Sequence, residues 1–493
     1  MSRVVKERDR ILNDLENVVG SENVSDDPVI RFAYRDFSSV WPKAVPDYVV
    51  RPGSVEEIQV IMRIANREKI PVIPFSAGVS IGGTIAKEGG ILLDLRRMNR
   101  IIEINRESMY CIVEPGVTYG QLYAELDKKY GDVKLSIPDS SPMCSVLANH
   151  TQVGLGEVHS KFEDNPTGVL GIEVVLPTGE VVATGSAAWP GSKWNCRYVL
   201  GPDLTGIFLR SMGYFGVITK ASIKLYPKPE VSQIYGVGYE DIKFAIKPVR
   251  ELLQKEIADR IVVRNWGLNL LYKHATVEVP PEIGKGPLPE ELLEKWKKET
   301  GSPEIQLHIT LEGNKEVVDV KERLMKKVIS KYNGNAQYLE LSETVKRISL
   351  EASMGKPSAD VVRSILGPRG GYDIAILYTW YDIWPELYND CKEILRIHGY
   401  PPLLSAKTLQ HGRASTFRFI FCHFDADNEE ECRKIQKVKS ELTKLAMEKY
   451  KVPSMGLPRE VMQQCRNYEL LKKIKTALDP NLIMHPSSPL GGE

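Results

Sequence analysis

Apolar residues in the first half of the chain come in short runs separated by amphipathic stretches, a pattern that predicts strands alternating with helices. A helical arm is expected over 2–19, and Ser54 with Glu57 forms a capping box ahead of apolar residues at helical spacing. Strands are expected at 48–50, 72–73, 91–95, 101–104, 110–114, 172–176 and 180–183, the last two as a hairpin, with a helix at 118–128.

The second half has a different pattern, with longer charged helices, and the change follows Pro227. Helices are expected at 290–300, 315–332, 428–449 and around 458–477, strands near 305–311, 373–378 and 417–424, and a polar loop at 276–290. The change predicts four segments: a helical arm at 1–44, one domain at 45–228, a second at 229–450, and a C-terminal segment at 451–493.

The composition is that of a globular protein and excludes several functional classes. The chain has 493 residues, and 65 basic against 64 acidic residues give a formal net charge of +1. Such a balanced chain has no overall field to attract nucleic acid. It lacks a secretory signal and any run of about 18 apolar residues, so we expect a cytoplasmic protein without a membrane span. Seven scattered cysteines read as reduced thiols, and no metal site is expected.

A loop of small residues, PFSAGVSIGG at 74–83, directly follows an expected strand. Small side chains let backbone N–H groups approach a phosphate closely, and Ser76 and Ser80 add hydroxyl donors. The loop lacks both the lysine of a nucleoside-triphosphate loop and GxGxxG spacing, and on its own it reads as a tight turn. A second loop of this kind covers 138–156, so the two could hold one pyrophosphate from both sides.

These loops belong to a set of segments that resembles the vanillyl-alcohol oxidase/p-cresol methylhydroxylase family of FAD-dependent oxidoreductases. The segments are VRPGSVEE (50–57), PFSAGVSIGG (74–83), NRIIEIN (99–105), YCIVEPGVTY (110–119), GIEVVLPTG (171–179), TG (184–185), GPDLTGIF (201–208), GYFGVIT (213–219) and ALDPNLI (477–483). The resemblance is dense over 45–228, sparse in the middle, and recovers near the end of the chain.

The resemblance implies an α+β fold. A PCMH-type FAD-binding domain of two subdomains would occupy 45–228, an α+β substrate-binding cap 229–450, and the C-terminal segment would return to the FAD domain. The pyrophosphate of FAD would lie on the two small-residue loops. The implied cofactor contacts are Ser76, Ala77, Gly78, Val79, Ser80, Ile81, Gly82, Pro138, Ser145, Asn149, Gly154, Ile218 and Asn481.

The chain departs from the phenol-oxidising members of this family at two places. Those members hold the phenolate with a tyrosine in the glycine loop and a later Tyr-Arg pair, because donors and a guanidinium stabilise a buried anion. Here Ile81 stands at the loop tyrosine, and Met455 and Gly456 align near the pair. A simple 4-alkylphenol is therefore not the expected substrate.

A second departure concerns how FAD is attached. Some members link FAD covalently to a His or Tyr of the cap. Here the corresponding stretch holds Ser415, Thr416 and Phe417, so non-covalent FAD is expected, with His411 or His423 as alternative anchors.

Three residues are candidates for catalysis. Asp164, seven residues before Gly171, matches an acid that lies beside the flavin in the family. It would take a proton or stabilise positive charge as hydride leaves, or it is only a solvated loop acid. His411 and Arg413 begin an expected cap strand and would serve as a base and as a carboxylate ligand, or they only end that strand.

The cap also offers candidate substrate contacts. Tyr378, Trp380 and Tyr381 form an aromatic run that would line an apolar pocket or pack in the cap core.

The expected function is that of an FAD-dependent dehydrogenase or oxidase. It would take hydride from an alcohol or an activated C–H carbon of a small organic molecule. A D-2-hydroxy-acid dehydrogenase is an alternative, although the HxGDGNxH pattern of such relatives is missing from HGRASTFRF at 411–419. Another is a flavin-bearing electron-transfer subunit of a larger complex. The electron acceptor would be a cytochrome, a quinone or a partner subunit, and the resemblance implies a homodimer.

Overall fold

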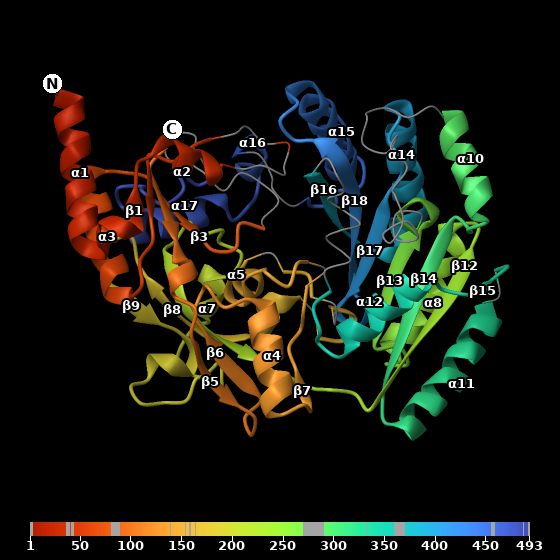
Figure 1. Cartoon of the computed structure of the whole chain (residues 1–493). Coiled ribbons are helices and arrows are strands. Elements are labelled where there is room, and N and C mark those ends of the chain that lie inside the picture. Colours follow the sequence, from red (N-terminus) through yellow and green to blue (C-terminus); the bar gives the residue numbers. More distant parts are fainter. Residues whose placement is uncertain are drawn as a thin grey trace.

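The computed structural model describes residues 3–35, 40, 44–79, 89–138, 140–152, 154–156, 159–162, 164–269, 290–332, 334–358, 370–454, 459–486 and 488–491. Two parts lie side by side (Figure 1). The N-terminal part holds the strands between residues 24 and 227, and the cap holds the large sheet between residues 231 and 425. This α+β architecture confirms the expected fold class, whereas the segment boundaries stay predictions.

The first sheet of the N-terminal part is mostly parallel. Its order is β1 (Val24–Ser25), β2 (Tyr48–Val50), β4 (Ile91–Asp94), β3 (Val72–Phe75), and α1 (Arg3–Val19) and α3 (Val55–Glu68) share its core. The short helix α2 (Pro28–Ala33) lies between β1 and β2 in the chain. The Ser54 side chain accepts a hydrogen bond from the Glu57 backbone N–H, as the capping pattern predicts. Ile58, Ile61 and Met62 then fall on the buried face of α3.

The second sheet is antiparallel and contains the expected hairpin. Its order is β5 (Ile101–Asn105), β6 (Tyr110–Val113), β10 (Val217–Lys224), β8 (Val169–Val175), β9 (Val181–Ala183), accompanied by α4 (Tyr119–Lys129), α5 (Val146–Thr151), α6 (His159–Phe162) and α7 (Thr205–Phe208). A two-stranded ladder joins β7 (Val133–Lys134) to β11 (Tyr226–Pro227).

The cap is built on an antiparallel sheet. Its order is β15 (Gln337–Leu339), β12 (Val231–Tyr239), β14 (Ile305–Gly313), β13 (Arg260–Asn265), β17 (Leu404–Leu409), β18 (Ala414–Asp425), β16 (Gly370–Thr379). One face shares an apolar core with α8 (Ile242–Gln254), α11 (Lys315–Tyr332), α14 (Trp384–Ile397) and α15 (Glu429–Glu448). The helix α12 (Glu343–Ser353) packs on the other face through Val345 and Ile348, and α10 (Glu290–Thr300) completes the cap.

The last residues of the chain return to the N-terminal part, where α17 (Tyr468–Leu478) appears in blue among the red elements (Figure 1). The single helix expected over 458–477 is wrong, because α16 (Arg459–Met462) ends before α17 begins. After α17, Met484 pairs with Val72 of β3 and is buried in the core of the first sheet.

A buried ion pair fixes this return. Lys475 and Asp479 are both fully buried, and their side chains lie 2.6 Å apart. The Lys475 ammonium also donates to the carbonyls of Tyr214 and Met484, and the Asp479 carboxylate accepts from the backbone N–H groups of Ile483 and Met484. Both charges are therefore hydrogen-bonded, as buried charges must be.

Candidate functional site

The first small-residue loop leaves β3 with a backbone that only glycine adopts easily. Gly78 has φ +68°, and a Cβ there would come within 2.7 Å of the Phe75 ring. Ser76, Ala77 and Val79 flank it in the described residues, whereas Ser80, Ile81 and Gly82 lie outside them. Over the described residues 76–79 the loop offers backbone and small side chains, as an approaching phosphate requires.

The second loop likewise has two glycine positions, Gly154 and Gly156, without room for a larger side chain. A Cβ on Gly154 would lie 2.2 Å from the Asn149 Oδ1 atom, and one on Gly156 would lie 2.1 Å from the Asn165 Oδ1 atom. Pro138 pairs with Gly156 in an isolated bridge, which brings the two ends of this loop together. These two glycine-lined loops fit the backbone cradle that a dinucleotide pyrophosphate needs.

Two other expected cofactor contacts, Ser145 and Asn149, are hydrogen-bonded within the protein. The Ser145 hydroxyl donates to the Pro115 carbonyl at 2.6 Å and accepts from the Ala148 N–H. The Asn149 Oδ1 atom accepts from Tyr119 and Asn165. These bonds hold the second loop in shape.

The remaining two expected contacts lie on other elements. Ile218 is 7% exposed on β10. Asn481, in the returning tail, is hydrogen-bonded to Asn66 of α3.

Asp164 and Tyr378 are joined by a residue that the sequence reasoning missed. The Arg210 guanidinium donates to the Asp164 carboxylate at 2.5 Å and to the Tyr378 hydroxyl at 2.9 Å. The backbone N–H of Arg210 also donates a hydrogen bond to the Thr151 carbonyl at the end of α5. This bond fixes the arginine beside the second loop. Arg210 thus links a candidate catalytic acid of the N-terminal part to a candidate substrate contact of the cap.

The other candidates of the cap lie elsewhere. His411 is in the turn Gln410–Gly412 between β17 and β18, with its Nδ1 atom 4.0 Å from Glu256, and the Arg413 side chain is exposed and bonds the Gln410 carbonyl. Trp380 is 38% exposed. Tyr381 packs against Trp384 in the cap core, on the helix-covered face.

The opposite face of the cap sheet carries charged side chains that the sequence reasoning also missed. The Lys407 ammonium donates to the Leu155 carbonyl at 3.2 Å, so this face meets the second loop of the N-terminal part. Lys407 is fully buried, and Arg418 and Arg264 on the neighbouring strands are 8% and 5% exposed. His159 of α6 reaches the same boundary, where its ring Nδ1 atom lies 2.5 Å from the Thr408 carbonyl.

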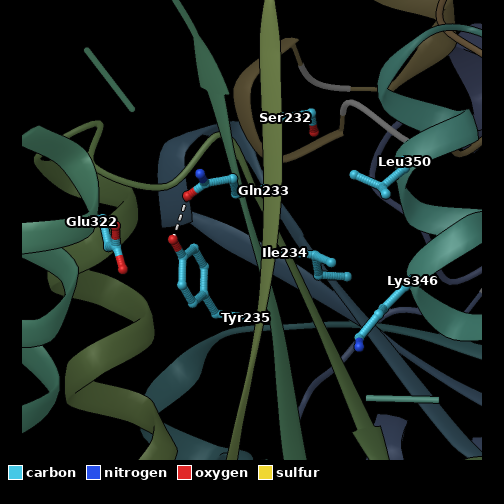
Figure 2. Close-up of a pocket in the computed structure, with 7 residues that line it drawn as sticks. All are labelled: Ser232, Gln233, Ile234, Tyr235, Glu322, Lys346 and Leu350. Carbon is cyan, nitrogen blue, oxygen red and sulfur yellow. Dashed lines mark hydrogen bonds between the residues drawn. The ribbon is translucent and has the colours of Figure 1, made fainter. Parts of the chain in front are cut away.

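A separate pocket of about 340 Å³ lies on the cap between β12, α11 and α12. Figure 2 shows Tyr235 turned toward Gln233, to which it is hydrogen-bonded, with Glu322 and Lys346 from the two helices. Burial raises the pKa of Tyr235 to about 12, so its hydroxyl keeps its proton at neutral pH. None of the candidate residues from the sequence lines this pocket.

The described part of the chain holds neither a membrane-spanning helix nor a cluster of metal-binding side chains. No helix there is both long and apolar enough to cross a bilayer. Within the same residues, no three His, Cys, Asp or Glu side chains gather in a way that could hold a metal ion.

Comparison with known proteins gives a family match and several similar proteins. Residues 46–185 match a family model described as an FAD binding domain. The chain is 31% identical over 297 residues to the 4-cresol dehydrogenase (hydroxylating) flavoprotein subunit of Pseudomonas putida, a match that covers 58% of this chain and 56% of that protein. It is 30% identical over 248 residues to a glycolate oxidase subunit of Bacillus subtilis, covering 50% and 51%.

A solved structure matches almost the whole chain. The crystal structure of p-cresol methylhydroxylase with substrate bound aligns with a TM-score of 0.87 and 24% identity, over 99% of this chain and 97% of that one. By contrast, the chain spans about half the length of the curated relatives it matches. The fold match thus extends over almost the whole chain, while these two sequence matches cover 58% and 50% of it.

Proposed function

Because the chain belongs to the p-cresol methylhydroxylase/vanillyl-alcohol oxidase family of FAD-binding oxidoreductases, we propose that it oxidises a small organic substrate by removing hydride from an alcohol or an activated C–H carbon. The single observation that carries the proposal is the hydrogen-bonded chain Asp164–Arg210–Tyr378. It joins an acid beside the second loop to the sheet that would cover a substrate.

FAD would lie with its pyrophosphate on the two loops that contain Gly78 and Gly154, and it would be held without a covalent bond. The backbone of these loops and the Ser76 hydroxyl supply donors. When bound, FAD supplies the two-electron acceptor for the substrate's hydride. Every other contribution comes from the chain itself, which binds and orients the substrate and handles protons.

Asp164, Arg210 and Tyr378 would form the reactive edge of the site. Arg210 holds the Asp164 carboxylate by a charge-assisted hydrogen bond and fixes the Tyr378 hydroxyl at the same time. Burial raises the pKa of Tyr378, so the phenol keeps a proton that it can donate to a substrate oxygen. Asp164 would stabilise positive charge that develops as hydride leaves, or take up a proton.

The substrate would not be a simple 4-alkylphenol. This part of the proposal rests on Ile81, Met455 and Gly456, which lie outside the described residues. The similarity to a glycolate oxidase subunit favours a 2-hydroxy acid as the second candidate substrate class.

The electron acceptor would be a cytochrome, a quinone or a partner subunit. The name of the relative from Pseudomonas putida, a flavoprotein subunit, supports a partner subunit. The proposal includes a homodimer, which family resemblance alone supports, and a cytoplasmic location, which rests on the scattered cysteines and the charged N-terminal sequence.

The visible spectrum of the purified protein, before and after acid precipitation, tests the cofactor assignment. Flavin bands that move to the supernatant are the expected result and would justify a search for alcohols that bleach the flavin without oxygen. Yellow colour left in the pellet would mean a covalent link. A colourless protein that FAD cannot reconstitute would overturn the oxidoreductase function and favour a role as an assembly subunit.

A further inference from the structure

The second small-residue loop is held by a buried asparagine that directly follows Asp164 in the chain. Asn165 is 2% exposed, and its backbone N–H donates to the Gly154 carbonyl at 3.0 Å. Its Nδ2 atom donates to the Asn149 Oδ1 atom at 2.6 Å, and its Oδ1 atom accepts from the Ser136 hydroxyl at 2.6 Å. A buried amide that is bonded at both of its polar atoms holds its neighbours in one geometry.

The same amides account for the glycines of this loop. A Cβ on Gly156 would lie 2.1 Å from the Asn165 Oδ1 atom and 2.2 Å from the Ser136 Oγ atom. A Cβ on Gly154 would lie 2.2 Å from the Asn149 Oδ1 atom, to which Asn165 donates. The backbone of the loop therefore packs directly against the side chains that Asn165 connects.

Asn149 can donate to a phosphate only through its amide nitrogen. Its Oδ1 atom already accepts from the Tyr119 hydroxyl at 2.9 Å and from the Asn165 Nδ2 atom. An amide oxygen has two lone pairs, so both are used, while the Nδ2 atom has two protons to donate. A phosphate bound to Asn149 would thus act on the side chain that Asn165 holds from the other end.

Asp164 is joined to the same loop at a second point, through Arg210. The Arg210 guanidinium donates to the Asp164 carboxylate, and the Arg210 backbone N–H donates to the Thr151 carbonyl at 2.7 Å. Thr151 ends α5, the helix that also contains Asn149. The loop, Asp164 and Arg210 therefore form a closed ring of bonds, and the guanidinium extends this ring to Tyr378 of the cap.

We propose that Asn165 is a positioning residue, through which a pyrophosphate on the second loop orders the Asp164 carboxylate. A ligand that holds the loop also holds the amide of Asn165, and with it the acid one residue earlier. The acid is thereby in place before a substrate arrives. This inference rests on the proposed function, because it concerns the regulation of the same site by its own cofactor. Coupling between two sites is reciprocal, so loosening the acid segment should also weaken FAD binding.

Amide hydrogen exchange of the full chain, with and without FAD, tests the coupling. The Asn165 amide proton is donated to the Gly154 carbonyl. The Thr167 amide proton is donated to the Asp164 carbonyl, so both protons report on the acid segment. We expect saturating FAD to slow their exchange roughly tenfold or more. Unchanged exchange at both residues with FAD bound would overturn the inference.

ADP separates the pyrophosphate from the flavin, because it carries the former without the latter. Saturating ADP should slow the exchange at Asn165 and Thr167 as FAD does. Protection by FAD without any protection by ADP would assign the effect to the flavin end of the cofactor, and this result would also overturn the inference.

Asn165→Ala separates a positioning role from a purely structural one. The variant keeps the backbone N–H and loses every side-chain bond, so FAD should bind about tenfold more weakly. At saturating FAD, protection should be lost at positions 165 and 167. It should remain at the Arg210 amide, which bonds Thr151 directly. A residue with a structural role alone would leave all three amides protected once FAD is bound, and that result would contradict the inference.

Two further variants complete the set. Tyr119→Phe removes the other donor to Asn149, should cause a smaller change in the same direction, and decides the matter if Asn165→Ala does not fold. Asn23→Ala is the matched control, because Asn23 is also buried in the N-terminal part and donates to the Val19 carbonyl. It should lower the melting temperature and leave FAD affinity and protection unchanged. Equal loss of protection in the control would count against Asn165.

The reduction potential of bound FAD tests the link from Asn165 to the Asp164 charge. It is measured against a reference dye, with xanthine and xanthine oxidase as the reductant. Loss of a nearby negative charge favours the reduced flavin, so Asp164→Asn should raise the potential. Asn165→Ala should raise it less, and the double variant should match Asp164→Asn alone. Effects of the two substitutions that simply add would contradict the inference.

The two proposals can fail separately. A potential that Asp164→Asn leaves unchanged would contradict the proposed role of Asp164, while the exchange data still decide the role of Asn165. If the protein binds no FAD, the proposed function fails. Exchange with ADP alone then decides the inference, which protection at Asn165 and Thr167 would support and its absence would overturn.

Discussion

The N-terminal part and the cap offer polar groups in different ways. The N-terminal part offers backbone at its two small-residue loops, where Gly78 and Gly154 leave no room for a side chain, and it meets the cap through side chains such as that of Arg210. The cap contributes long side chains, among them Lys407 and Arg418, from the middle of paired strands. A backbone site depends on the shape of a few consecutive residues, whereas a side-chain site depends on which strands are neighbours. Cofactor binding and substrate choice should therefore be separable by mutation.

The largest expected effect is the loss of FAD in Gly78→Asp. A side chain at φ +68° is strained, its Cβ would meet the Phe75 ring, and its carboxylate would repel a pyrophosphate. We expect almost no flavin in the purified variant, measured as the flavin-to-protein absorbance ratio. Gly201→Asp is a matched control, because Gly201 has φ +69° with open space around its Cβ position. Full flavin content in Gly78→Asp would show that the loop does not contact FAD.

Asp164→Asn should slow reduction of the flavin by the substrate about 100-fold while FAD stays bound. The amide keeps the size of the side chain but loses the charge that Arg210 contacts. Rapid mixing without oxygen measures the rate. Asp203, which forms a similar pair with Arg197, offers Asp203→Asn as the control. Equal rates in the two variants would remove Asp164 from the chemistry.

Asp479→Asn should destabilise the N-terminal part by about 3 kcal/mol, because Lys475 would then be a buried charge without its counter-charge. Urea unfolding followed by flavin release measures the change. Asp373→Asn tests the cap for comparison, where the partner Lys439 is 19% exposed and can be reached by water. A smaller loss is expected there, and a larger loss would reverse the ranking of the two ion pairs.

The smallest effect is the share of His150 in a dependence of stability on pH. Burial lowers the pKa of His159 and of His308 in the cap well below the usual value, so these residues contribute to the same dependence. Burial lowers the pKa of His150 to about 4, from an ordinary value of 6.5. The unfolded chain therefore binds more protons between these values, so stability falls as the pH falls. From pH 6.5 to pH 5 the loss is about 2 kcal/mol for this residue. His150→Gln should flatten the profile, although His485, with a pKa also lowered to about 4, keeps part of it.

The sequence predicts the N-terminal part well because its signals are local. The N-cap at Ser54 and the hairpin each occupy a few consecutive residues and are confirmed, although the Glu57 carboxylate accepts from the Gly53 N–H and does not complete a capping box with Ser54. The role of the glycine loop stays a prediction, because residues 80–83 lie outside the described residues. The cap was predicted less completely. The strands β12, β13, β15 and β17 and the helices α8, α12 and α14 were missed. In α8 the signal was present, because Ile242, Ala245 and Val249 recur at helical spacing and are buried.

The charged surface of the cap shows why part of the site could not be predicted. Lys407 and Arg418 are in one stretch of chain, but the surface also includes Arg264 and His159, which come from distant stretches. Only the pairing of β13 with β17 and the insertion of α6 bring them together. Alternation of polar and apolar residues in β17 was the one available signal. Arg210 gave none, because its position depends on the backbone at the end of α5.

The return of the tail determines when the N-terminal part can fold during synthesis. Strand β3 emerges early from the ribosome, yet its neighbour Met484 and the anchoring Lys475 are made after the whole cap. At typical rates of translation this is a delay on the order of half a minute. During that time the edge of β3 and the core around α1 and α3 are incomplete, while the cap already has all of its strands. The nascent chain should therefore fold its cap first. The N-terminal part, although it is translated earliest, should be the last to complete its core.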